Sequence, residues 1–360
     1  MPGYLAPDTD RSSAAELRPE SALFDNRFNL APERLTALID TRRELLEGLA
    51  QHPEWAEMEA ELSDLLKTVL NSGCLRLQRI DRHSPTPVLD QIVKYEAVHR
   101  IRDSRDLERR MAEDRRCYAF FHPALPSEPL IFTELALTHG MSSNAEALLD
   151  PESPIVDPST CTCAIFYSIS SCHEGLSGVP LGNALIGQVA DELARAFPGL
   201  ETFATLSPVP GFRSWLTTLA RSHAGGAASA RAAASLTSLE RSDWYADVDT
   251  SAELKPLLVP LCAYYLLHVK RGDDPADPVA RFHLRNGARL ERINWLSDTS
   301  AASMRRAAGL MVNYVYRCNN PRREYDASTS TRKVQASRQV KRLAGQASSL
   351  LGVRSLVDRL

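Results

Sequence analysis

The sequence has no long hydrophobic run and no excess of charge of either sign. None of its apolar stretches approaches the roughly 20 residues that a membrane-spanning helix needs. Its 42 Lys and Arg residues against 45 Asp and Glu residues give a net charge of −3, whereas a dedicated nucleic-acid binder carries many phosphate-neutralising cations. The first twenty residues are acidic and contain no apolar stretch, so we expect neither a secretory nor a transit peptide. These features predict a cytoplasmic protein that binds neither nucleic acid nor membranes.

A disulfide framework and a metal-binding motif are also missing. The seven cysteines are odd in number and scattered, and the close pair Cys161 and Cys163 has the wrong spacing for a zinc knuckle. None of the nine histidines stands in an HxH or HExxH pattern. We therefore expect most cysteines to be buried as small hydrophobic residues, and no metal site.

What is present is an ordinary globular composition over 360 residues, with 44% apolar and 24% charged residues, enough for a sizeable core. Residues 1–28 are rich in Ser, Pro and Asp and predict a mobile tail. Apolar stripes at 32–49 and 53–69 predict a helical hairpin. A hairpin of about forty residues cannot bury two apolar faces alone, so we expect it to dock on the main domain or another subunit. The predicted domains are a helical oligomerisation element at 29–80 and a catalytic domain at 81–360.

Beyond the hairpin, short β-branched and aromatic runs are interleaved with amphipathic stretches. They predict strands at 117–121, 130–137, 163–170, 203–206, 288–295 and 310–316, and helices at 87–95 (capped by Thr86), 104–111, 182–197, 212–221 and 253–270. The Ala-, Gly- and Ser-rich residues 222–235 predict a surface insertion. The basic segment after Tyr316 could bind an acidic surface, but a solvated helix packing through Val334, Val340 and Leu343 is the favoured interpretation. This mixed order is typical of an α/β or α+β domain.

The most informative segment runs from a strand at 166–170 through Gly175, Gly178 and Gly182 into a helix. Glycines allow positive φ and close approach of a ligand, so that successive N–H groups can point at one anion. The helix N-terminus adds partial positive charge. The spacing matches neither a Walker A loop nor GxGxxG, and such a turn is more often only a turn. Taken alone, the segment is a candidate pyrophosphate site.

Two further side chains stand in unusual surroundings. Ser207 is flanked by Pro208 and Pro210, which present its hydroxyl from a stiff, extended corner. A serine at this place more often caps the following helix. His283 falls in a short predicted helix that begins after Pro278, and a lone histidine there is more often a hydrogen-bonded core residue. Local sequence alone favours the structural role for both residues.

Five segments together resemble a known family. The segments 122–137, 166–183, 206–212, 277–295 and 309–316 occur in the order seen in malonyl-CoA decarboxylases. The resemblance implies an α+β fold, in which a shortened N-terminal helical domain precedes a GNAT-like, acyltransferase-type catalytic domain with a mixed, splayed sheet. In that domain a splayed strand pairs with the pantetheine arm of coenzyme A, and the following loop and helix hold its pyrophosphate.

The resemblance also implies an activity, the conversion of malonyl-CoA to acetyl-CoA and CO₂ in fatty acid metabolism, and residues that carry it. Ser207 matches the family serine that orients or polarises the malonyl unit, His283 matches the histidine that donates the proton, and Tyr316 matches a tyrosine near the active site. Tyr316 could equally be a half-buried strand residue. The coenzyme A contacts that the resemblance implies are Ser177, Gly178, Val179, Pro180, Leu181, Gly182 and Asn183. Family members form dimers or tetramers, so we expect a homo-oligomer.

The chemistry needs no added cofactor, because the thioester carbonyl of malonyl-CoA can accept the electrons that CO₂ leaves behind. A histidine suits the protonation step, since its reference pKa near 6.5 makes both protonation states accessible at neutral pH. Three alternatives remain open: an acyl-CoA-dependent N-acyltransferase, a non-catalytic malonyl-CoA sensor, and a serine hydrolase. The hydrolase ranks last, because the sequence has no G-x-S-x-G elbow around Ser207.

Overall fold

The chain divides into two units by its internal contacts. The computed structural model describes residues 31–71, 73–221, 226–241, 243–316 and 334–350, so the predicted tail at 1–28 lies outside the described residues. The smaller unit holds residues 1–75, 122–126 and 173–179, and the larger unit holds the remaining 76–121, 127–172 and 180–360. In the described part of the chain, no helix is long and apolar enough to span a membrane.

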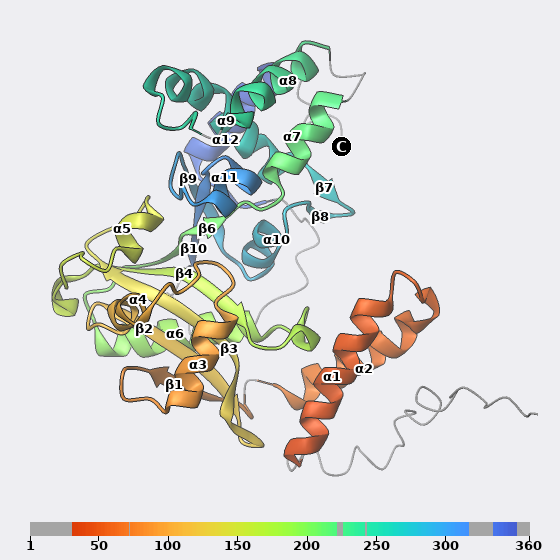
Figure 1. The fold of residues 1–360 in the computed structure, drawn as a ribbon, viewed down its shortest axis with the longest axis vertical. Coiled ribbons are helices and arrows are strands. Elements are labelled where there is room, and N and C mark those ends of the chain that lie inside the picture. Colours follow the sequence, from red (N-terminus) through yellow and green to blue (C-terminus); the bar gives the residue numbers. More distant parts are fainter. Residues whose placement is uncertain (1–30, 72, 222–225, 242, 317–333, 351–360) are drawn as a thin grey trace, which may run out of the picture. The chain divides into compact units, whose positions relative to one another are not determined.

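The smaller unit contains the predicted helical hairpin. Helices α1 (Pro32–Gly48) and α2 (Ala56–Val69) pack on each other, and the red and orange ribbons of Figure 1 show them side by side. Leu35, Ile39 and Leu45 are buried on the inner stripe of α1, as its helical spacing predicts. The same helix packs on a short 3₁₀ helix, η4 (Glu174–Leu176).

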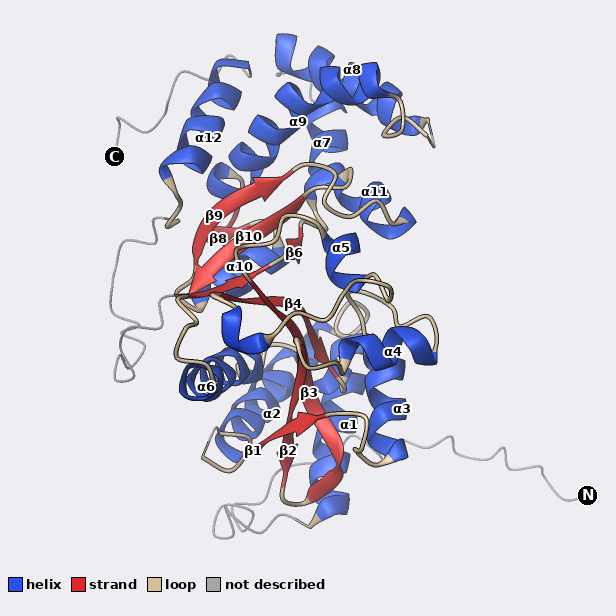
Figure 2. Ribbon diagram, turned by 90° about the vertical axis from the view of Figure 1, so that its left-hand side faces the viewer, coloured by secondary structure: helices blue, strands red, loops and turns tan. Residues whose placement is uncertain are grey.

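The larger unit is built on one eight-stranded, mixed sheet (Figure 2). The strand order is β1-β2-β3-β4-β5-β10-β6, with β9 also paired to β10. The strands are β1 (Arg76–Ile80), β2 (Arg115–His122), β3 (Leu125–Thr138), β4 (Cys163–Ser171), β5 (Thr202–Thr205), β6 (Ser207–Pro208), β9 (Arg289–Asn294) and β10 (Met311–Tyr316), and a separate two-stranded ribbon joins β7 (Lys270–Arg271) to β8 (Asp274–Pro275). The strands predicted from apolar runs are thus confirmed, although β3 begins five residues earlier than expected.

The one parallel pair whose register is described, β4 and β5, separates along its length. Cys163–Phe166 of β4 pairs with Thr202–Thr205 of β5, and β4 continues beyond the last of these described pairs to Ser171. Helix α6 (Leu181–Ala196) connects the two strands, as a parallel crossover requires. This divergence is the splayed sheet that the family resemblance implied, so the predicted α+β, GNAT-like fold class is confirmed.

Helices cover the sheet and bury the main core. They are α3 (Thr86–Tyr95), α4 (Ser104–Arg110), α5 (Ala145–Leu149), α7 (Phe212–Arg221), α8 (Gly226–Glu240), α9 (Val248–His268), α10 (Pro278–Arg285), α11 (Ala301–Ala307) and α12 (Arg338–Leu350). The largest cluster of buried apolar residues joins α7, α9, α11 and α12 to β9 and β10. Most cysteines are buried as predicted, since five of the six described ones lie inside the protein.

These helices bear on three predictions made from local sequence. Of the surface insertion expected at 222–235, residues 222–225 lie outside the described residues, and the rest belongs to helix α8, which begins at Gly226 and buries Ser235, because alanine-rich sequence favours helix. Thr86 is not a cap but the first residue of α3, whose cap position is Pro85. The favoured interpretation of the basic C-terminal segment is confirmed for its described part, where Val340 is fully buried while Arg338, Lys341 and Arg342 are exposed.

Candidate functional site

Ser207 lies at the point where strand β10 stops pairing with β5 and begins pairing with β6. It is the second residue after β5 and opens the two-residue strand β6, in which it pairs with Val312 of β10. The prolines at 208 and 210 keep the chain extended at this point, as the sequence predicts. The Ser207 side chain is buried, and its hydroxyl is bonded to other side chains of the larger unit. The serine is therefore fixed in the interior.

His283 reaches the same point from helix α10. Asp277 caps the helix by accepting hydrogen bonds from the N–H groups of Val279 and Ala280, and the chain leaves it at Gly287, whose φ of +77° favours glycine. Asp277 also accepts a hydrogen bond from the N–H of Gly211, 3.2 Å away, in the turn that follows Ser207. One carboxylate thus joins the helix that carries the histidine to the turn that carries the serine.

The three predicted catalytic side chains meet in one hydrogen-bonded line. Ser207 Oγ lies 2.9 Å from His283 Nε2, and His283 Nδ1 lies 2.8 Å from Tyr316 Oη. The imidazole stacks on the ring of Tyr314, with 4.5 Å between ring centroids and 24° between planes. Only 3% of His283 is exposed. Its ring is thus held at both nitrogens and on one face.

Burial sets the charge state of this line. Loss of solvation lowers the pKa of His283 to about 3, and it raises the pKa of Tyr316 well above its ordinary range. Both groups are therefore neutral at physiological pH in the free protein. The expectation that His283 exchanges freely between two protonation states near pH 7 is wrong, because the reference pKa describes a solvated ring.

A fourth side chain, which sequence reasoning missed, completes the line. The hydroxyl of Ser207 donates to Thr205 Oγ1 at 2.9 Å, and the N–H of Tyr314 donates to the same oxygen at 3.3 Å. Thr205 is 1% exposed. One feature of the sequence could have identified Thr205: it stands two residues before Ser207 in an extended run, and residues i and i+2 share one face of a strand.

Asn313 secures the backbone beneath Thr205. Its fully buried amide donates to the carbonyl of Thr205 at 2.8 Å and accepts from Arg292 Nε at 3.1 Å. The amide also accepts from Asn294, so both ends of the side chain are satisfied. The pairing of β9 with β10 shifts register between Asn313 and Tyr314. Arg292 therefore braces this strand through Asn313.

The glycine loop leads into α6 with the features of an anion site. Gly178 has a φ of +78°, a conformation that favours glycine. Helix α6 starts at Leu181, and Pro180 at its cap position makes no side-chain hydrogen bond to the first turn. Ser177–Val179 belong to the smaller unit, in which Arg42 Nη1 donates to the carbonyl of Gly175. Pro180–Asn183 belong to the larger unit together with the serine–histidine pair.

The first turn of α6 lies against the helix that carries His283. A Cβ atom on Gly182 would come within 2.7 Å of the Phe282 ring, so a larger residue there would require this ring to move. Phe282 immediately precedes His283 in α10. The helix N-terminus and the serine–histidine pair are therefore neighbours within the larger unit, as a shared binding site for a coenzyme A ester requires.

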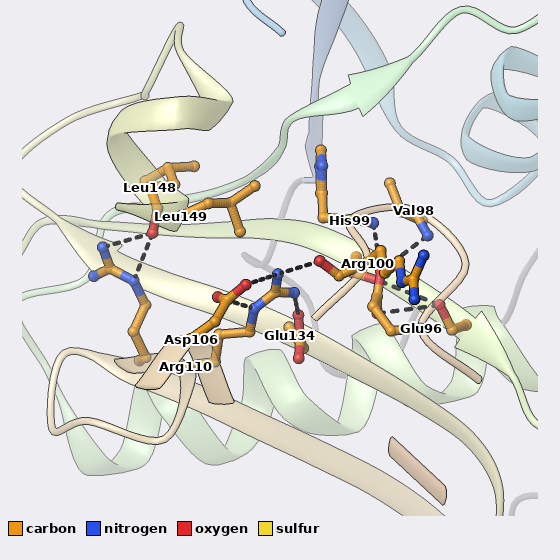
Figure 3. Close-up of polar contacts among 12 residues, drawn as sticks. Glu96, Val98, His99, Arg100, Asp106, Arg110, Glu134, Leu148 and Leu149 are labelled. Atoms are coloured by element: carbon orange, nitrogen blue, oxygen red, sulfur yellow. Dashed lines mark hydrogen bonds and ion pairs between the residues drawn. The ribbon is translucent and has the colours of Figure 1, made fainter. Parts of the chain in front are cut away.

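A second buried polar cluster in the larger unit was not predicted. The guanidinium of Arg110, at the end of α4, lies between two carboxylates in Figure 3: Asp106 at 3.0 Å and Glu134 on β3 at 2.7 Å. The carboxylate of the fully buried Asp114 in turn pairs with two arginines, Arg109 and Arg115. Burial, together with the nearby Glu96, raises the pKa of Glu134 to about 8. We call these six residues, Asp106, Arg109, Arg110, Asp114, Arg115 and Glu134, the arginine cluster.

The diverging parallel strands, the helix N-terminus beside them and the buried serine–histidine pair define the class of protein, an α+β enzyme with a GNAT-like catalytic domain. The model of the malonyl-CoA decarboxylase C-terminal domain matches residues 73–352. The chain belongs to the malonyl-CoA decarboxylase family.

Individual relatives agree with this assignment. The chain is 38% identical over 330 residues to the mitochondrial malonyl-CoA decarboxylase of Anser anser anser, a match covering 85% of this chain and 66% of that protein. It resembles the solved malonyl-CoA decarboxylase of Agrobacterium vitis at 42% identity with a TM-score of 0.80, covering 88% of this chain and 77% of the other. For the enzyme from Rhodopseudomonas palustris the values are 42% identity, a TM-score of 0.78, and 85% and 75% coverage. The chain thus spans about two thirds of the goose protein.

Proposed function

We propose that this protein converts malonyl-CoA to acetyl-CoA and CO₂, with Ser207, His283 and Tyr316 as its catalytic residues. One observation carries the proposal: a buried histidine held between a serine and a tyrosine, on the helix that packs against the first turn of α6. The relatives described above bear the name of this activity.

Coenzyme A would bind along the splayed sheet. The pyrophosphate fits the first turn of α6, because the helix dipole and N–H groups without a side-chain cap favour an anion there. Within the larger unit the contacting residues would be Pro180–Asn183, while contacts from Ser177–Val179 of the smaller unit stay a prediction. Residues 167–170 of β4, which lie beyond the last described pair with β5, would face the amide groups of the pantetheine arm.

The reaction divides into bond cleavage and protonation. The bond between the carboxylate and the α-carbon breaks, its electron pair moves into the thioester to form an enolate, and CO₂ leaves. A buried site that strips the carboxylate of water favours this step, and Ser207 orients the malonyl unit. The α-carbon then takes a proton from Nε2 of His283, and one proton is recovered from solvent in each turnover. No electron sink beyond the thioester is needed.

The direct test is to incubate purified protein with malonyl-CoA and to measure acetyl-CoA and CO₂ without an amine acceptor. We expect His283→Ala to lower kcat by roughly 10²–10⁴-fold, the usual contribution of a general acid. His139→Ala is the matched control, because His139 is exposed and outside the hydrogen-bonded line.

Any other result of this assay would indicate a different function for the protein. Tight binding of malonyl-CoA without turnover would indicate a sensor, release of free malonate and CoA would indicate a hydrolase, and turnover only with an amine would indicate an acyltransferase. An unchanged rate in a folded His283→Ala variant would remove this residue from the mechanism.

Two wider features belong to the same proposal. We place the enzyme in the cytoplasm, which fits the six free cysteines among the described residues, since reduced thiols are typical of that compartment. We also expect a homo-oligomer, a dimer or tetramer, as in the family. Light scattering on a sizing column tests this expectation, and a monomer at working concentration would contradict it.

A further inference from the structure

Four side chains form a continuous line whose hydrogen bonds have a direction. Tyr316, His283, Ser207 and Thr205 are joined by contacts of 2.8, 2.9 and 2.9 Å. We call these four residues the donor chain. Distances alone leave open which atom donates in the two contacts of the imidazole, because each ring nitrogen can act as donor or acceptor.

The direction is set at the threonine end. The geometry makes Ser207 Oγ the donor to Thr205 Oγ1, and the same oxygen accepts from the N–H of Tyr314. A serine hydroxyl has one proton, so Ser207 cannot also donate to His283. The remaining arrangement has His283 Nε2–H donating to Ser207.

The other end follows from the charge of the ring. His283 is neutral, because burial lowers its pKa to about 3, and a neutral imidazole carries one N–H. With that proton on Nε2, Nδ1 is an acceptor, and Tyr316 donates to it. The donor chain therefore runs one way, from Tyr316 through His283 and Ser207 to Thr205.

We propose that Thr205 is a positioning residue that holds His283 in the tautomer protonated on Nε2. The proposal rests on the function proposed above, in which that nitrogen supplies the proton to the α-carbon. In a serine hydrolase the polarity is the reverse: the serine gives its proton to Nε2, and a carboxylate accepts from Nδ1–H. Here a phenol replaces that carboxylate and a threonine accepts the serine proton, so the pair is arranged to give a proton.

The direction of the hydrogen bonds in the donor chain also shows how protons can move during the reaction. As Nε2 gives its proton to the enolate carbon, Nδ1 takes the phenolic proton of Tyr316, and the ring ends neutral. After the product leaves, Nε2 takes a proton from solvent while Nδ1 returns its proton to the phenolate, which restores the starting state. No charged imidazole is formed, and the negative charge lies on the Tyr316 phenolate only until Nδ1 returns its proton.

The experiment compares two substitutions at one position. Thr205→Val keeps the shape and removes the acceptor, whereas Thr205→Ser keeps the hydroxyl. We expect Thr205→Val to lower kcat by roughly 10–100-fold, part of what a general acid contributes, while KM for malonyl-CoA changes little. Thr205→Ser should retain most of kcat. Loss of kcat in both variants, or in neither, would contradict the proposal.

A second measurement reads the protonated nitrogen of His283 directly, including in the wild-type protein. The ¹⁵N shifts of a histidine ring identify its protonated nitrogen, and the His283 signals can be assigned by their loss in His283→Gln. We expect Nε2 to be protonated in the wild type, and Thr205→Val to show proton density on Nδ1. A wild-type ring protonated on Nδ1 would overturn the proposal even if decarboxylation is confirmed. Conversely, absence of decarboxylation with Nε2 protonated would reject the function and leave the direction of the donor chain intact.

Discussion

The larger unit buries two polar networks that solve the same physical problem differently. The donor chain contains neutral groups only, joined one after another by single hydrogen bonds. The arginine cluster contains full charges, and each of its three guanidiniums contacts at least one carboxylate. Apart from the partly buried Tyr316, the members of both networks are almost completely inaccessible to water.

This difference in charge means that the hydrogen bonds of the donor chain can be rearranged, whereas the ion pairs of the arginine cluster cannot. Reorienting a neutral hydrogen bond costs about 1 kcal/mol, so a substrate can replace one partner in the donor chain. Removing one member of a buried ion pair leaves an uncompensated charge, which costs several kcal/mol. We infer that the arginine cluster holds α4 on the sheet strands β2 and β3, whereas the donor chain performs chemistry.

The largest expected effect is on stability, in the arginine cluster. Arg110→Met removes the charge between Asp106 and Glu134, and we expect a loss of about 3–5 kcal/mol in the free energy of unfolding. Urea denaturation measures it, and kcat per folded molecule should stay close to wild type. Arg305→Met is the control, since this exposed arginine on α11 should change stability by about 0.5 kcal/mol or less. A loss below about 1 kcal/mol in Arg110→Met would place the pair among solvent-screened salt bridges.

The next effect distinguishes the donor chain by its response to acid. The pKa of His283 is lowered to about 3 in the folded state, against an ordinary value of 6.5 in the unfolded chain. Between these values the unfolded chain binds the extra proton. The resulting stability is therefore present above pH 6.5 and is lost as pH falls, by up to about 1.4 kcal/mol per pH unit.

The measurement is the difference in unfolding free energy between wild type and His283→Gln from pH 7 to pH 4.5. Because glutamine does not titrate, we expect the wild type to lose more stability than the variant over this range. Parallel curves for the two proteins would show that His283 is more solvated than its contacts indicate.

The helix and strands that carry the donor chain could largely be predicted from the sequence, because nearby residues determine where they begin and end. Pro278 and Gly287 bracket the helix of His283, Pro208 follows Ser207, and β-branched runs mark the strands. The family resemblance then supplied the roles of Ser207 and His283. Thr205 was missed because its importance lies in the direction of one hydrogen bond, which no local pattern encodes.

The arginine cluster could not be predicted for a related reason. Its helix was expected as a short, highly charged segment, which is typical of an exposed surface. Arg110 is nevertheless buried, because Glu134 comes from the middle of an apolar strand 24 residues further along the chain. Long-range pairs of this kind depend on sheet register. The neutral state of His283 depends on burial against Ser207 of β6 and Tyr314 of β10, which are distant in the sequence, so no local pattern shows it.

The smallest expected effect comes from the one member of the arginine cluster that resembles the donor chain. Glu134 has a pKa raised to about 8, mainly by burial, so it is protonated near neutral pH. Its stabilising contribution is fully present below pH 4.5 and is lost as pH rises through 8. Since a neutral acid and an amide have similar shape and polarity, we expect Glu134→Gln to cost about 1 kcal/mol or less at pH 6.

The pH dependence sharpens this expectation. The Oε2 atom of Glu134 accepts from Arg110 in the structure, and the amide oxygen of glutamine can do the same. Unfolding free energies at pH 6 and pH 8.5 should therefore fall in the wild type and stay nearly level in Glu134→Gln, apart from changes common to both. If the substitution instead costs as much at pH 6 as Arg110→Met does, Glu134 is charged at that pH, and it belongs with Asp106 as a permanent partner of the guanidinium.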